Sequence, residues 1–173
     1  KKIKKSKIFY KNFFLPNSKL NFAENLLSKN NDEKAITFIS ENGFRKEQTW
    51  LELNQNTSKL QEFLKLKKIK QKDRVAAYMP NIIETVEAFI STTSIGAIWS
   101  SCSPDFGVKG VIERFSQINP KLLFITDQYF YNGKQINILE RLPEILKKIP
   151  SIQNVVVTNY PGKKFIKYKR KIK

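Results

Sequence analysis

The sequence predicts an α/β fold, with a mainly parallel sheet and flanking helices. Strand-like segments alternate with segments of helical periodicity along most of the 173 residues, which is the order found in βαβ units. Residues 74–79 form an apolar run with little polar alternation, as buried inner strands of parallel sheets do. Turn signals such as Pro80-Asn81 separate these segments.

The chain begins with an expected lead-in that contains one short helix. Residues 13–27 have the pattern of an extended entry followed by a helix. Asn21 is the expected helix cap, and Glu24 stands at the spacing of a capping box. The polar, turn-rich segment 28–32 marks a boundary before the next element.

A hairpin and a long helix are expected next. Residues 35–40 and 44–49 are strand-like, and the Glu41-Asn42-Gly43 turn between them predicts a hairpin. Thr49 then caps a helix, with Glu52 as its capping-box partner. The side chains expected on one face of this helix are Leu53, Thr57, Leu60 and Leu64.

Four strands of the parallel sheet are expected, with helices between them. Asn81, with Glu84, is the expected start of the first of these helices, and Gly96 fits its end. Either Ser103 or Asp105 is expected to open the second helix. The predicted strands are residues 74–79, 97–101, 121–126 and 152–158, and the later helices are expected to end at Ile118 and to span residues 136–149.

The net charge of +17 suggests a polyanionic partner, but the distribution of charge argues against one. Residues 1–11 hold six lysines and residues 163–173 hold seven basic residues, without any acid, so the remainder carries only +4. The chain has 27 lysines and only 5 arginines, whereas a specific nucleic-acid reader more often uses the planar fork of arginine. We therefore expect solvated lysine-rich ends, no specific nucleic-acid partner and no membrane partner.

Cysteine and histidine usage excludes several kinds of chemistry within this chain. With one cysteine and no histidine, a disulfide within the chain and the Ser-His and Cys-His nucleophile systems are impossible, and a Cys/His metal site is not expected. No apolar run reaches the length of a membrane span, and the lysine-rich start lacks the apolar stretch of a secretory signal. The expected location is the cytoplasm.

Three stretches of the sequence have residue orders that are specific enough to compare with known families. They are Asp73-Arg74-Val75-Ala76-Ala77-Tyr78-Met79-Pro80-Asn81, Ile98-Trp99-Ser100-Ser101-Cys102-Ser103-Pro104-Asp105-Phe106-Gly107 and Tyr129-Phe130-Tyr131-Asn132-Gly133-Lys134. In these stretches the chain resembles the adenylate-forming acyl-CoA synthetases, and among them the enzymes that activate acetoacetate. The resemblance runs from about Phe13 to Tyr160 and corresponds only to the amino-terminal part of such an enzyme.

The resemblance implies a domain division and a function. Residues 1–30 would be an acetyl-CoA-synthetase-type lead-in, residues 31–162 the incomplete start of the AMP-binding domain, and residues 163–173 a basic tail. The complete enzyme would use ATP, CoA and Mg²⁺ to convert acetoacetate, through an acyl-adenylate, into acetoacetyl-CoA. None of the six glycines forms a phosphate loop, so the chain alone is expected to be inactive, with no catalytic or metal-binding residues of its own.

The candidate cofactor-binding residues follow from the same resemblance. In related acetyl-CoA synthetases, the loop equivalent to Tyr131, Asn132, Gly133 and Lys134 contacts CoA. Lysine suits a phosphate, and an aromatic face suits a base, although Tyr131 stands where those relatives have an arginine. The alternative interpretation of this loop is a solvated turn.

Other residues have a structural and a functional interpretation. Ser100, Ser101 and Ser103 either donate hydrogen bonds to a ligand at a strand end or cap their own turn. Gly107 and Gly110 are better explained by close helix packing than by an anion site, and Cys102 and Trp99 are better explained as core residues. The competing functions are a synthetase for another short acid, such as acetate or propionate, and a small basic nucleic-acid-binding protein.

Overall fold

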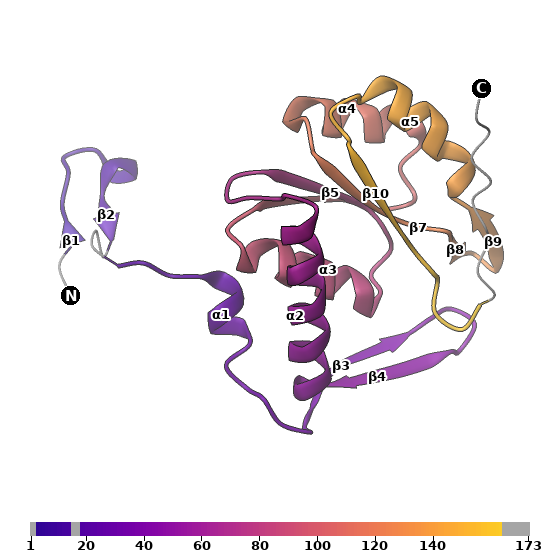
Figure 1. Cartoon of the computed structure of the whole chain (residues 1–173), viewed down its shortest axis with the longest axis horizontal. Coiled ribbons are helices and arrows are strands. Elements are labelled where there is room, and N and C mark those ends of the chain that lie inside the picture. Colours follow the sequence, from indigo (N-terminus) through magenta and orange to yellow (C-terminus); the bar gives the residue numbers. More distant parts are fainter. Residues whose placement is uncertain (1–2, 15–17, 164–173) are drawn as a thin grey trace.

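A four-stranded parallel sheet lies at the centre of the computed structural model, which describes residues 3–14 and 18–163 (Figure 1). Its strand order is β10-β7-β5-β6, which confirms the predicted α/β class. The strands are β5 (Arg74–Tyr78), β6 (Ile98–Cys102), β7 (Leu122–Thr126) and β10 (Asn154–Thr158). The inner strands β5 and β7 are almost wholly buried, as their apolar sequences require.

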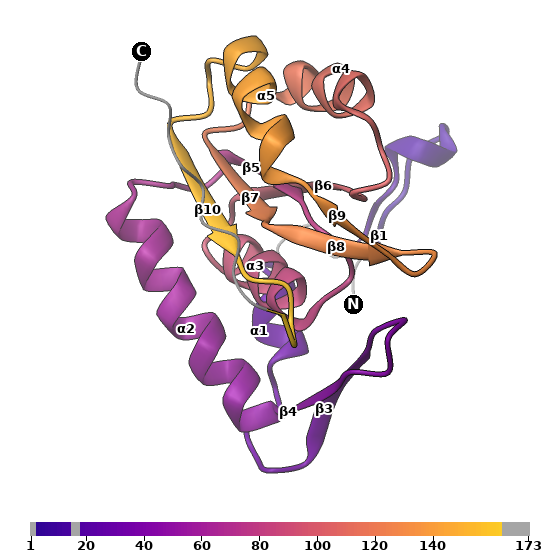
Figure 2. The same cartoon turned by 90° about the vertical axis from the view of Figure 1, so that its right-hand side faces the viewer.

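Helices cover both faces of this sheet (Figure 2). On one face lie α2 (Trp50–Leu66) and α3 (Ile83–Ser94), and on the other lie α4 (Val108–Ile118) and α5 (Leu142–Lys148). The core between the layers includes Phe115 and Phe124, at 0% and 2% exposure. Burial of one such side chain contributes about 1.5–3 kcal/mol, so this three-layer core supplies the main stabilising force.

Two of the predicted helix caps are confirmed. Asn21 caps α1 (Phe22–Leu26) by accepting hydrogen bonds from the backbone of Ala23 and Glu24. It also donates from Nδ2 to the carbonyl oxygen of Ser94, 2.9 Å away, which fastens α1 to the end of α3. Thr49 and Glu52 form the complete capping box at the start of α2.

The other two predicted caps are wrong. Helix α3 begins after Ile82, without a side-chain cap, and Asn81 takes no part in it. Helix α4 begins after Gly107, also without a side-chain cap. Ser103 and Asp105 instead bond each other, since Ser103 Oγ donates to Asp105 Oδ2 over 2.7 Å. Short polar side chains can close a local turn as readily as they cap a helix, and the sequence does not distinguish the two.

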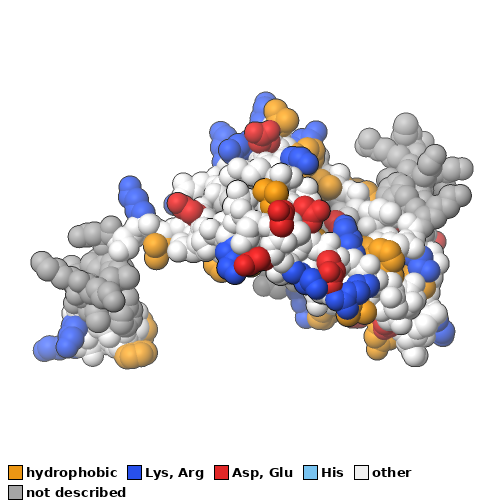
Figure 3. Space-filling model, turned by 90° about the horizontal axis from the view of Figure 1, so that it is seen from below, with side chains coloured by type: hydrophobic (Ala, Val, Ile, Leu, Met, Phe, Trp, Pro, Cys, Tyr) orange, Lys and Arg blue, Asp and Glu red, His pale blue; other side chains and the backbone are white. Residues whose placement is uncertain are grey.

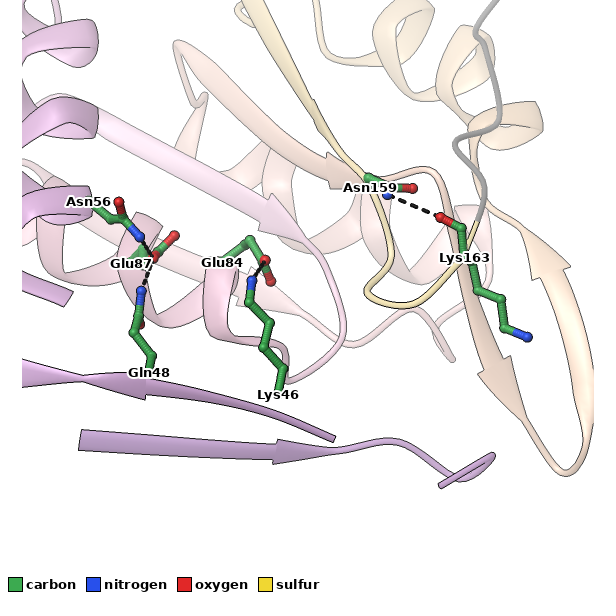
Figure 4. A network of polar contacts seen from close by, with 7 residues as sticks. All are labelled: Lys46, Gln48, Asn56, Glu84, Glu87, Asn159 and Lys163. Atoms are coloured by element: carbon green, nitrogen blue, oxygen red, sulfur yellow. Dashed lines mark hydrogen bonds and ion pairs between the residues drawn. The ribbon is translucent and has the colours of Figure 1, made fainter. Parts of the chain in front are cut away.

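The predicted first hairpin is present as β3 (Lys34–Ile39) and β4 (Arg45–Thr49). Polar contacts attach it to the helices (Figure 4). Lys46 Nζ lies 2.8 Å from Glu84 Oε1 of α3. The amides of Gln48 and Asn56 both donate to Glu87 Oε1, at 2.6 and 2.8 Å. A two-stranded hairpin is only marginally stable alone, so α2 and α3 hold it in place.

A second hairpin, which the sequence reasoning missed, follows β7. It consists of β8 (Gln128–Tyr131) and β9 (Lys134–Asn137). The helix predicted for residues 136–149 is therefore wrong at its start. A 3₁₀ turn, η2 (Leu139–Arg141), precedes α5. The missed signal was Asn132-Gly133, a typical two-residue hairpin turn, in which both residues have positive φ, 51° and 72°.

The amino-terminal unit lies apart from this body (Figure 1). It contains β1 (Ile3–Lys4), η1 (Phe9–Lys11) and β2 (Phe13–Phe14), with β1 and β2 antiparallel. The predicted basic tail, residues 163–173, lies outside the described residues except for Lys163. No helix in the described part of the chain is both long enough and apolar enough to span a membrane.

Candidate functional site

A polar cavity of about 270 Å³ opens at the carboxyl edge of the parallel sheet. It lies where β5 and β6 end and where the chain leaves β7. Because β6 and β7 flank β5 on opposite sides, the strand order reverses here, and ligands of open α/β sheets bind at such points. The cavity is lined by Met79, Pro80, Asn81, Thr85, Ser101, Cys102, Ser103, Pro104, Asp105, Tyr129, Phe130 and Tyr131.

Two of the three serines singled out in the sequence reach this cavity. Ser101 and Ser103 line it, whereas Ser100 does not. Trp99 packs in the core, with its ring centroid 6.1 Å from that of Phe124. Cys102 is 4% exposed, and burial raises the pKa of its thiol. A buried, protonated thiol is a poor nucleophile, so the structural interpretation of Cys102 is confirmed.

Asp105 is the carboxylate of the cavity wall. Ser103 donates to it. Burial and the neighbouring Asp105 carboxylate raise the pKa of Tyr129, so its phenol stays protonated at neutral pH. The wall therefore presents one carboxylate among neutral hydroxyl and amide groups, which suits hydrogen bonding to a polar ligand rather than attack on it.

The predicted CoA-binding residues form the turn of the second hairpin. Tyr131 lines the cavity and is 57% exposed, and it pairs with Lys134 across the hairpin. Asn132 and Gly133 make the turn itself. The structure thus brings Tyr131 to the cavity and sets the exposed Lys134 beside it, while Asn132 and Gly133 are not among the residues that line the cavity.

A carboxylate stands at the same turn. The backbone N–H of Gly133 donates to Glu41 Oε2 over 3.4 Å, although the two residues are 92 positions apart. Glu41 belongs to the turn of the first hairpin, so the tips of the two hairpins lie side by side, as Figure 2 also shows. This negative charge opposes binding of a phosphate at the turn, and nothing local in the sequence reveals it.

The two glycines considered as an anion site have different surroundings. A Cβ at Gly107 would meet nothing within 4 Å, so the packing explanation is wrong for this residue. At Gly110 a Cβ would lie 3.3 Å from Arg114 Nη1 and 3.4 Å from the Phe106 ring. Close packing therefore accounts for Gly110 alone.

The residues that sequence reasoning missed come from outside the predicted loop. Asn81 and Thr85 reach the cavity from the segment after β5, and Tyr129 reaches it from β8. Tyr78 and Arg141 lie behind its wall. Tyr78 and Tyr129 stand inside the quoted motifs, but only pairing of the strands brings them together. Within the described residues, no group of three or more acidic or cysteine side chains is placed to hold a metal ion.

Known proteins match this chain closely over a part of their length. An acetoacetyl-coenzyme A synthetase from Rhizobium meliloti is 44% identical over 86% of the chain, and a malonamoyl-CoA synthetase from Penicillium aethiopicum is 38% identical over 81%. The structure of an acetoacetyl-CoA synthetase from Streptomyces lividans matches 84% of the chain with a TM-score of 0.80 and 33% identity.

The chain spans less than a quarter of each of these relatives, namely 23% of the Rhizobium protein, 20% of the Penicillium protein and 23% of the Streptomyces structure. A family model described as AMP-binding enzyme matches residues 23–170. The match covers most of the chain, including the parallel sheet and the cavity at its edge, and the chain belongs to the family of AMP-binding enzymes.

Proposed function

We propose that this chain is the amino-terminal part of a ligase that activates acetoacetate with ATP and transfers it to CoA. In the first half-reaction the carboxylate displaces pyrophosphate from ATP and forms an acyl-adenylate. In the second, the CoA thiol displaces AMP and gives acetoacetyl-CoA. Support comes from the similarity to acetoacetyl-CoA synthetases. We expect the enzyme to work in the cytoplasm, where ATP and CoA are available.

The observation that carries the proposal for this segment is the polar cavity beside the second hairpin. Its hydroxyl groups and Asp105 suit the amide and hydroxyl groups of CoA, and its volume of about 270 Å³ holds a piece of that molecule rather than all of it. Lys134 would bind a CoA phosphate as a point charge, and the exposed ring of Tyr131 would contact the base.

The sequence and the described residues do not offer the groups that would bind the triphosphate of ATP and a magnesium ion. The sequence has no glycine-rich phosphate loop, and in the described residues no acidic cluster is placed for a metal ion. A triphosphate needs such neutralising groups. Under the proposal, adenylation depends on residues outside this chain, and the segment contributes a wall of the CoA site.

The proposal is tested by comparing the 173-residue chain with the full-length protein from the same gene. The full-length protein should form acetoacetyl-CoA. The chain alone should catalyse no ATP–pyrophosphate exchange with acetoacetate or acetate. Exchange above a blank, in a preparation free of host synthetase, would contradict our assignment of adenylation to other parts of the protein.

A different short acid is the second candidate substrate, because a malonamoyl-CoA synthetase is also a relative. The discriminating measurement is kcat/KM of the full-length protein for acetoacetate, malonamate, acetate and propionate. A clear preference for an acid other than acetoacetate would replace the proposed substrate while leaving the ligase reaction in place.

A further inference from the structure

The loop that forms one wall of the cavity is held from behind by two side chains far from it in sequence. This loop, residues 103–107, connects β6 to α4 and brings Ser103, Pro104 and Asp105 to the cavity. Tyr78, the last residue of β5, donates its hydroxyl to the carbonyl oxygens of Phe106 and Pro104, at 2.6 and 3.1 Å. Its side chain is completely buried.

Arg141 completes this arrangement from η2. Its Nη1 donates to the carbonyl oxygens of Pro104 and Phe106, at 2.9 and 3.3 Å, and to the hydroxyl oxygen of Tyr78. A phenol has a single proton and cannot fully satisfy two carbonyls. The guanidinium supplies the missing donors and leaves the Tyr78 proton facing the loop, so the two side chains act together.

Arg141 is half-buried and forms none of the ion pairs of the described residues. Its Nη1 group donates to carbonyl and phenol oxygens, which replace part of the water around the charge. Burial raises the pKa of Tyr78 despite the neighbouring guanidinium, so the phenol remains a neutral donor.

We infer that Arg141, together with Tyr78, is a positioning residue of the CoA site. It fixes the backbone of residues 104–106 and thereby the places of Ser103 and Asp105 in the cavity wall. This inference rests on the proposed function, because it assumes that the cavity receives CoA. A preorganised wall spares the ligand the cost of ordering the loop.

The test measures CoA affinity in the full-length protein by titration calorimetry, together with hydrogen exchange of the amides of residues 103–108. Arg141→Met should weaken CoA binding about tenfold and speed exchange of this loop more than of the sheet. Arg141→Lys retains a cation with three donors and should recover part of the loss. Tyr78→Phe should weaken binding in the same direction.

Two control variants separate positioning from other causes. Lys109→Met removes a positive charge from the start of α4, where Lys109 is exposed, and should leave CoA affinity unchanged. Asp73→Asn alters the opposite edge of the sheet and should lower the melting temperature without changing CoA affinity. An affinity loss in either control that equals the loss in Arg141→Met would overturn the inference.

The remaining outcomes are decisive as well. Absence of CoA binding by the unaltered full-length protein would reject the proposed function itself. Normal CoA affinity in Arg141→Met, with or without faster loop exchange, would reject the positioning role and leave the proposed function standing. If Arg141→Met does not fold, Arg141→Lys and Tyr78→Phe are judged by the same affinity criterion.

Discussion

Two side chains of opposite charge stand at the Asn132-Gly133 turn. Lys134 is exposed and, among the described ion pairs, has no partner, whereas the Glu41 carboxylate accepts from the Gly133 backbone. A phosphate that approaches the turn therefore meets one attractive and one repulsive charge. Each can be removed separately, which makes the turn testable at the level of single residues.

Lys134→Ala should raise the KM for CoA about tenfold in the full-length enzyme, because one charge-assisted contact is lost. Acetoacetate-dependent pyrophosphate exchange, which does not use CoA, should stay near normal. Lys147→Ala, an exposed lysine in the last turn of α5, is the matched control. If both half-reactions fall together, the turn is structural. If neither changes, the assignment of this loop to CoA is wrong.

Glu41→Gln should have the opposite effect and tighten CoA binding. Loss of an exposed charge beside the turn changes the interaction by roughly 0.5–1 kcal/mol, or about two- to fivefold in affinity. The gain should shrink as salt rises, since exposed charges are screened. Weaker CoA binding in this variant would show that Glu41 supports the turn rather than opposing the ligand.

At the scale of elements, an ion pair joins two of the connections at the amino edge of the sheet. Asp73, just before β5, lies with Oδ1 2.7 Å from Lys121 Nζ, just before β7, and it also accepts from the backbone N–H of Lys70 over 2.9 Å. Burial acts to raise the pKa of Asp73, but these partners outweigh it and the pKa is lowered.

A lowered pKa in the folded state gives a stability that is present above the unfolded pKa and is lost as pH falls. Asp73→Asn should therefore cost about 1–3 kcal/mol of unfolding free energy near neutral pH. The difference from the unaltered protein should diminish below about pH 4, near the pKa of an unfolded aspartate. Denaturant titrations of both proteins at several pH values measure it, and a pH-independent difference would exclude the ion pair as its cause.

Local chemistry made some elements predictable and left others ambiguous. The Thr49–Glu52 capping box and the Glu41-Asn42-Gly43 turn depend on neighbours in sequence, and both are confirmed. Ser103 and Asp105 could each either cap α4 or close a local turn, and in the structure they bond each other in the turn. The second hairpin was missed because its strands are short and its turn was interpreted as a loop.

At the scale of the whole molecule, the excess positive charge is concentrated at the chain ends. On the face shown in Figure 3, acidic and basic side chains are interspersed. A hollow at the amino edge of the sheet is lined by Lys67, Lys68, Lys70 and Lys121, of which Lys121 is paired with Asp73. This hollow in the described body holds four basic residues, against the twelve basic residues in segments 1–7 and 163–173.

Deletion of residues 1–7 and 163–173 should remove most nonspecific binding to RNA or DNA. It removes β1 and its pairing with β2 but should leave the parallel sheet and its helices folded. Each lost phosphate contact lowers the salt dependence of binding by about 0.7–0.9 in log–log slope. The triple variant Lys67→Gln, Lys68→Gln, Lys70→Gln, in the undeleted chain, should change this slope little. Binding that survives the deletion at moderate salt, and disappears in the triple variant, would identify the hollow as a polyanion site.

The sequence by itself determined the α/β class, the first hairpin, the confirmed caps of α1 and α2 and the kinship with acyl-CoA synthetases, because propensity, turns and motifs are local properties. Tertiary structure alone decided which residues share the cavity. Parallel pairing aligns the ends of β5 and β6, and the second hairpin closes over them. The contacts of Arg141 with Tyr78 and of Glu41 with Gly133 span 63 and 92 positions, and no local pattern encodes contacts that exist only after the layers have packed.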